Sequence, residues 1–115
     1  MTESEALAFI NAAMMSEAEL QYNIIQMAQT LGWLVHAERP AMKKNGKWST
    51  PIQGDKGFPD LVLARGFHVL FVELKSETGK PSEAQLHWFG ALPKGIWQLW
   101  KPRDWFSGKI EEVLR

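Results

Sequence analysis

Two patterns of apolar residues alternate along the chain and predict both helices and strands. Residues 16–31 place apolar side chains three and four positions apart, which is typical of a helix with one buried face. Residues 68–72 are almost entirely apolar, as expected of a strand that is covered on both faces. The same reasoning along the chain predicts helices over 2–14, 16–31, 82–92 and from 102 onward, and strands over 33–38, 61–64, 68–72 and 97–100.

This order of elements indicates an α/β fold in which helices flank a mixed β-sheet. The strands over 61–64 and 68–72 form a hairpin around a tight turn at 65–67. The strand–helix–strand unit over 70–100 should pair its two strands in parallel, because a helix connects them.

The chain divides into a short extension and one main domain. Residues 1–15 form an N-terminal helical extension, and residues 16–115 form the domain. Leu7, Ile10 and Met14 share one side of the extension, which suits either packing against the domain or a dimer contact.

The composition is that of an ordinary globular protein, with 45% hydrophobic and 23% charged residues in a chain of 115. Thirteen basic and thirteen acidic residues give zero net charge, which argues against a protein that coats nucleic acid non-specifically. The chain has no cysteine, so disulfide bonds and thiolate metal ligands are excluded. Because no apolar run reaches the roughly 20 residues of a membrane span, we expect a soluble, cytoplasmic protein.

Three charged residues mark the candidate site. Glu73 and Lys75 follow the apolar strand two positions apart, so both project from the same face. Asp60 opens the preceding strand, and the hairpin should return Glu73 and Lys75 to its neighbourhood. Two carboxylates and an amine suit hydrolysis assisted by Mg²⁺ or Mn²⁺, which prefer oxygen ligands. Alternatively, Glu73 and Lys75 form a simple ion pair at a strand end, and Asp60 only stabilises a turn.

These residues resemble a known nuclease signature. Pro59-Asp60, twelve intervening residues and Glu73-x-Lys75 resemble the PD-(D/E)xK motif, and the wider pattern resembles the VRR-NUC family of that superfamily. The wider pattern covers about residues 16–115 and includes Glu19-Leu20-Gln21, Gly32-Trp33-Leu34-Val35-His36, Pro51-Ile52-Gln53-Gly54, Gly57-Phe58-Pro59-Asp60, Ser82-x-x-Gln85 and Trp100-x-Pro102-x-Asp104. The resemblance implies a restriction-endonuclease-like sheet core and a homodimeric endodeoxyribonuclease that acts on branched DNA such as Holliday junctions, in a bacterial or phage-infected cell.

The resemblance also suggests roles for individual residues. Asp60, Glu73 and the backbone carbonyl of Leu74 would bind the cation, while Lys75 would steer the attacking water. Two further polar residues, Gln85 and Glu19, would complete the site, Gln85 at a phosphate or a water and Glu19 indirectly or at a second ion.

Glu19 and Gln85 have a structural interpretation as well. Ser16-x-x-Glu19 and Ser82-x-x-Gln85 both have the form of a capping box, in which the third residue after the serine closes back on the serine backbone. The two interpretations do not exclude each other.

The polar loop over 39–56 is the candidate contact surface for DNA. Its cationic and aromatic side chains suit phosphate contacts and base stacking, although a solvated loop would have a similar composition. The predicted nucleic-acid contacts, including the serine that starts the next helix, are Lys43, Lys44, Lys47, Trp48, Lys56 and Ser82.

Three functions remain open at this point. The first is a metal-dependent, structure-specific DNA endonuclease of the Holliday-junction-resolvase type. The second is a DNA-binding or scaffold module of the same fold without catalysis, in a phage or recombination complex. The third is a metal-dependent phosphohydrolase acting on nucleotides, which the lack of a glycine-rich helix start disfavours.

Overall fold

The computed structural model describes residues 1–38, 41–42, 44–49 and 52–115. Its elements are α1 (Glu3–Met14), α2 (Glu17–Thr30), β1 (Leu34–Ala37), β2 (Ala41–Met42), β3 (Trp48–Ser49), β4 (Leu61–Arg65), β5 (His68–Leu74), α3 (Glu83–Ala91), β6 (Trp97–Trp100), α4 (Pro102–Phe106) and α5 (Lys109–Leu114).

Four strands form one mixed sheet in the order β1-β4-β5-β6. β4 pairs antiparallel with both β1 and β5, whereas β5 and β6 are parallel. The helix α3 connects the two parallel strands, so the expectation for residues 70–100 is confirmed. The mixed sheet flanked by helices confirms the predicted α/β class at this coarse level. The strands β2 and β3 form a separate two-stranded hairpin.

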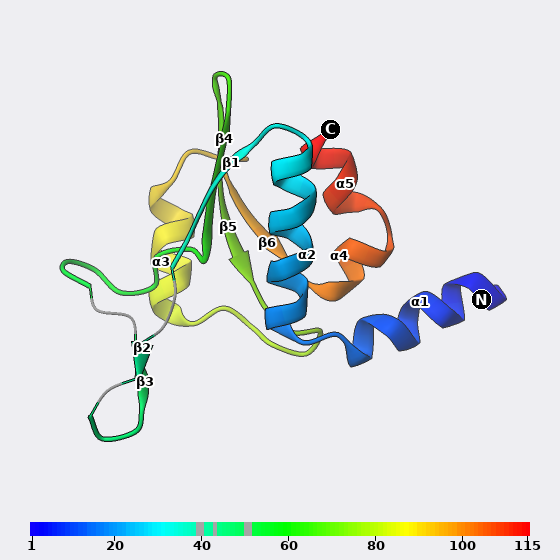
Figure 1. Ribbon diagram of the computed structural model, residues 1–115, viewed down its shortest axis with the longest axis horizontal. Helices are drawn as coiled ribbons and strands as arrows, with labels where there is room; N and C mark the ends of the chain where they lie inside the picture. Colours follow the sequence, from blue (N-terminus) through cyan, green and yellow to red (C-terminus); the bar gives the residue numbers. More distant parts are fainter. Residues whose placement is uncertain (39–40, 43, 50–51) are drawn as a thin grey trace.

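The helices divide between the two faces of the four-stranded sheet. Figure 1 shows α2, α4 and α5 on one side and α3 on the other. The hydrophobic core lies on the side of α2, α4 and α5, and its fully or almost fully buried residues are Leu20, Ile24, Ala28, Trp33, Leu61, Leu63, Val72, Leu74, Trp100, Ile110 and Leu114. One face of the sheet is therefore covered by three helices, and the other by a single short helix.

One prediction for the helix on the second face was wrong in part. The spacing of residues 82–92 predicted Leu86, Phe89 and either Ala84 or Leu92 as inward-facing; Leu86 and Phe89 are 50% and 47% exposed, whereas Ala84 and Leu92 are partly buried. The Phe89 ring packs against Trp97 at 4.9 Å between centroids. The partly buried side of α3 is therefore the one that carries Ala84, Gln85 and Trp88.

The predicted C-terminal helix is in fact two helices. Gly108 lies between α4 and α5 with φ +85°, a left-handed conformation that interrupts the helix. This break allows Ile110 and Leu114 of α5 to reach the core.

The extension α1 packs against α4 and buries little of its own surface. Ala12 is its buried residue. Leu7, Ile10 and Met14 are 56%, 51% and 77% exposed, and Phe9 is 66% exposed. The apolar stripe predicted on this helix is thus not covered by the domain. No helix in the described part of the chain is both long and apolar enough to cross a bilayer.

Candidate functional site

The register of the β4–β5 hairpin sets Asp60 opposite Glu73. Leu61 pairs with Val72, so one further step along both strands places Asp60 across from Glu73. The hairpin closes between Arg65 and His68, and Gly66 takes the positive φ of +62° that this short turn requires. Side chains at directly opposed positions lie on the same face, so the fold brings the two predicted carboxylates together.

The side chain of Asp60 is fixed by the neighbouring strand. Its Oδ2 atom accepts a hydrogen bond of 2.8 Å from the backbone N–H of Leu74. The predicted role of Leu74 concerns its carbonyl oxygen, which this N–H contact does not involve, so that role stays a prediction. This hydrogen bond holds the Asp60 carboxylate beside the end of β5.

Glu73 is a fully buried acid. Its Oε1 atom accepts a hydrogen bond of 2.7 Å from the Gln85 side-chain amide and lies 3.4 Å from the Lys75 ammonium nitrogen. Its Oε2 atom is buried without a hydrogen-bond partner. Burial raises the pKa of Glu73 to about 8, and the negative charge of the neighbouring Asp60 adds to the increase, while Lys75 opposes it.

The charged cluster (Asp60, Glu73 and Lys75) thus sets a buried acid with a raised pKa beside a second carboxylate and an ammonium group. A divalent cation could take the place of the proton on Glu73, because it would supply positive charge between the carboxylates and a partner for the unpaired Oε2 atom. Within the described residues, no group of three or more His, Asp or Glu side chains converges on one point.

Gln85 closes the predicted capping box and also contacts Glu73, whereas its role at a phosphate or a water stays a prediction. Its Oε1 atom accepts from the Ser82 backbone N–H at 2.7 Å, and Ser82 Oγ accepts from the Gln85 N–H at 3.2 Å, so the capping box is complete. At the same time its Nε2 atom donates to Glu73. The start of α3 thus positions an amide that holds one oxygen of the buried acid.

Glu19 lies in the other capping box. Its Oε1 atom accepts from the Ser16 N–H at 3.1 Å, and these hydrogen bonds with Ser16 lower its pKa. The structure connects Glu19 to Ser16, and within the described part of the chain it joins Glu19 to none of the charged cluster by a hydrogen bond or ion pair.

Glu17 is the acid of α2 whose pKa is affected by Asp60 and Lys75, and the sequence pattern did not identify it. Although the residue as a whole is exposed, burial of its carboxyl group and the negative charge of Asp60 raise its pKa, and Lys75 lowers it. The capping box was an available signal. A Glu19 carboxylate that accepts from Ser16 is held at the start of the helix, so Glu17, the other acid of the first turn, becomes a candidate for the site.

Two further residues hold the segment before Asp60 against α3. Gly57 has φ +87°, and a Cβ atom there would lie 2.5 Å from the Ala84 carbonyl carbon and 2.7 Å from the Gln85 nitrogen. Trp88 donates its indole N–H to the Lys56 carbonyl at 2.9 Å. The loop that leads into Asp60 and the helix that carries Gln85 are therefore in direct backbone contact.

The predicted nucleic-acid contacts are only partly described by the structure. Lys44 and Lys47 are exposed, as is Lys56. Lys43 and the side chain of Trp48 lie outside the described part. The Ser82 hydroxyl is occupied as the cap of α3. These residues remain predictions as DNA contacts.

Comparison with known proteins finds no family model, no curated protein and no solved structure that matches this chain. The function therefore has to be argued from the site alone.

Proposed function

We propose that this protein is a metal-dependent endonuclease that hydrolyses phosphodiester bonds in DNA. The observation that supports this most directly is the buried Glu73 carboxyl group opposite Asp60, with one oxygen left without a partner. A fully buried acid is costly unless it is paired or bound to something. A cation would neutralise the two carboxylates and give the remaining oxygen of Glu73 a partner.

In this proposal Asp60 and Glu73 hold Mg²⁺ or Mn²⁺. The chemistry that the cation supplies is neutralisation of phosphate charge and a lowered pKa of water. Gln85 keeps the Glu73 carboxylate in one orientation through its amide, and the N–H of Leu74 does the same for Asp60. Both carboxylates are thus held in position before any substrate arrives, which avoids a reorganisation cost during the reaction.

Lys75 provides the positive charge of the chain itself. Its side chain is 19% exposed, so it borders both the buried Glu73 and the solvent from which a substrate would enter. In the transition state of hydrolysis, negative charge grows on the phosphate oxygens, and a fixed ammonium group nearby stabilises it. The same group would orient the attacking water.

For the substrate we propose branched DNA of the Holliday-junction type, cut by a homodimer that cleaves two strands. The exposed apolar residues of α1 support a dimer, because a stripe of this kind commonly forms an interface. Light scattering should give twice the mass of the chain, and Ile10→Ser with Met14→Ser should shift the protein to a monomer. A wild type that is monomeric at all concentrations would contradict the dimer.

One assay tests the proposed activity. The protein is incubated with linear duplex, flap, splayed-arm and four-way junction DNA in Mg²⁺, Mn²⁺ or EDTA. We expect cleavage of the junction with either cation, none in EDTA, and none by Lys75→Ala. The control Lys94→Ala removes an exposed lysine from the opposite end of the sheet and should cleave normally. Binding of DNA without any cleavage by the wild type would instead favour the scaffold function.

A further inference from the structure

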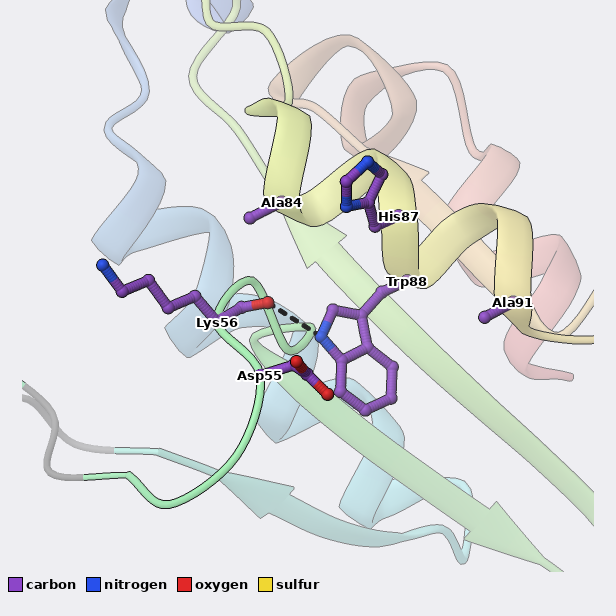
Figure 2. Close-up of a pocket in the computed structure, with 6 residues that line it drawn as sticks. All are labelled: Asp55, Lys56, Ala84, His87, Trp88 and Ala91. Atoms are coloured by element: carbon purple, nitrogen blue, oxygen red, sulfur yellow. Dashed lines mark hydrogen bonds between the residues drawn. The ribbon is translucent and has the colours of Figure 1, made fainter.

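A cavity lies between α3 and the segment that leads into Asp60. It has a volume of about 460 Å³ and is lined by Asp55, Lys56, Ala84, His87, Trp88 and Ala91. Figure 2 shows the Trp88 indole projecting from α3 toward Asp55 and Lys56, with its N–H directed at the Lys56 carbonyl. This volume lies within the range of roughly 300–1,000 Å³ that is usual for ligand sites.

The walls of this cavity are held in place. Besides the hydrogen bond to Lys56, the Trp88 ring packs edge-on against Phe58, with 5.0 Å between centroids and an angle of 89°. Gly57 packs directly on the backbone of α3 at Ala84. A ligand would therefore meet an aromatic ring whose position is already fixed, which lowers the entropic cost of binding.

The chemistry of the lining suits a nucleotide. Ala84, His87, Trp88 and Ala91 follow the spacing of one helix face, and the two alanines leave space beside the two rings. The Lys56 side chain extends away from the indole in Figure 2, so its ammonium group is free to meet a phosphate. Aromatic rings beside a cationic side chain are the usual features of a site for single-stranded nucleic acid.

A second cavity, lined by residues of α2, Glu38 and residues 58–60, has an acidic lining. It measures about 560 Å³, and its charged lining residues are Glu17, Glu38 and Asp60, without a lysine or arginine. Without a bound cation, phosphates are repelled from these three carboxylates, whereas the first cavity balances the single acid Asp55 with Lys56. The charges therefore favour entry of a DNA strand over the α3 side.

From these observations we propose that the cavity at Lys56, His87 and Trp88 binds one unpaired nucleotide of the DNA strand, adjacent to the position of hydrolysis. Its base would stack on the aromatic lining, and its phosphate would contact Lys56. The cavity is adjacent to the charged cluster because Ala84, which lines the cavity, precedes Gln85 in the chain, and Gln85 donates a hydrogen bond to Glu73. That the ligand belongs to a DNA substrate rests on the proposed function, whereas a ligand with an aromatic base and a phosphate is inferred from the lining of the cavity.

The test measures binding in EDTA, so that it does not depend on hydrolysis. Two fluorescent oligonucleotides about six nucleotides long are compared, one of thymidines and one of abasic sites with the same phosphates. His87→Ala should weaken binding of the thymidine oligonucleotide about tenfold, in line with loss of a stacked base, and leave the abasic one unchanged. Lys56→Ala should weaken both equally and reduce the salt slope of binding by about 0.7.

Matched controls remove the same side chains at the other end of the sheet. His68→Ala and Lys94→Ala alter an exposed histidine and an exposed lysine near the β4–β5 turn and the start of β6, and neither should change binding. A thymidine mononucleotide should bind at least tenfold more weakly than the oligonucleotide, and equal affinity would overturn the placement of a strand. Trp88 is left intact because its indole holds the loop.

The outcomes separate this inference from the proposed nuclease activity. Cleavage by the wild type, with His87→Ala and Lys56→Ala binding both oligonucleotides as the controls do, would overturn the nucleotide cavity and leave the nuclease intact. Base-dependent binding that is lost in His87→Ala, without cleavage of any DNA, would support the cavity and remove the nuclease.

Discussion

Two helices of this protein begin with the same motif and use it differently. At the start of α2, Glu19 accepts from the Ser16 N–H, and at the start of α3, Gln85 accepts from the Ser82 N–H. The glutamine has a second polar atom, Nε2, which donates to Glu73. An ionised carboxylate has only acceptors, so Glu19 could not make the same contact. An amide can thus close a helix and position a buried acid at once.

The same contrast appears in the titration of the acids. Hydrogen bonds from Ser16 lower the pKa of Glu19, whereas burial raises the pKa of Glu73 to about 8. Glu19 stabilises the fold when it is ionised, and that contribution is lost as the pH falls below its ordinary pKa of 4.5. The buried position of Glu73 disfavours its ionised form, so its contribution to stability falls as the pH rises.

The largest effect should come from replacing Glu73, the buried acid that the capping residue of α3 contacts and the capping residue of α2 does not. Glu73→Gln keeps the size and the contact with Gln85 but loses the charge that would hold a cation. We expect the rate of DNA cleavage to fall about a thousandfold, which corresponds to several kcal/mol of lost charge stabilisation. The check is single-turnover cleavage in Mg²⁺. Cleavage at the wild-type rate would refute the assignment of Glu73.

The pH dependence of stability gives a second test of Glu73. In EDTA the folded protein keeps the Glu73 proton up to about pH 8, while the unfolded chain releases it near 4.5. Because the folded state then binds more protons, stability should fall as the pH rises between these values. Urea denaturation from pH 5 to 8 should show this decline in the wild type and a flatter profile in Glu73→Gln. Mg²⁺ should stabilise the wild type more at pH 8 than at pH 6.

Exchanging the two capping residues tests the comparison directly. Gln85→Glu keeps an acceptor for the Ser82 N–H but places an oxygen against Glu73, so the amide contact is lost. We expect cleavage to slow roughly 10- to 100-fold, as for other residues that orient a ligand of a metal. Glu19→Gln is the matched exchange in α2 and should leave the rate unchanged. Equal rates for both variants would show that Gln85 serves only as a cap.

The two serines separate stability from activity. Ser16→Ala and Ser82→Ala each remove one hydroxyl that caps a helix, and each should cost about 1 kcal/mol of the free energy of unfolding. Only Ser82→Ala frees the residue that contacts Glu73, so only this variant should also slow cleavage by a few-fold. Chemical denaturation and cleavage rates on the same samples check both statements. A slower Ser16→Ala would mean that α2 contributes to the site through its cap.

The smallest effect is expected at Glu17. Its charge lies near Asp60 and Lys75, so Glu17→Gln should weaken Mg²⁺ binding by a few-fold, which calorimetry can measure. Glu19→Gln, which changes the same charge two residues away, should bind Mg²⁺ as the wild type does. If only Glu19→Gln weakens binding, the prediction from the family resemblance is the better one.

Much of the fold could be predicted because local patterns and global packing agree. The buried face of α2, both capping boxes and the β4–β5 hairpin follow from spacing, and the hairpin alone implies that Asp60 and Glu73 meet. The inward face of α3 could not be predicted, because apolar residues occur on more than one side of this short helix. The role of Gly57 depends on contact with a helix about 27 residues away, for which the sequence contains no local signal.

The choice between Glu17 and Glu19 shows the limit of a motif. Both acids lie in the first turn of α2, and the family resemblance points to Glu19, whereas the capping pattern assigns Glu19 to the start of the helix. Which acid faces Asp60 depends on how α2 lies against the end of β4, and this is a property of the packed core.

The two-residue turn at Gly66 and Phe67 has a consequence for how this protein can change. Five residue pairs separate it from the charged cluster, about 16 Å along the hairpin. Replacing Phe67, which is fully exposed, should leave the chemistry intact. Inserting or deleting one residue there would turn Glu73 away from Asp60, since a slip of one residue exchanges the faces of a strand. The turn should therefore tolerate a different side chain at position 67 but not a change in its length.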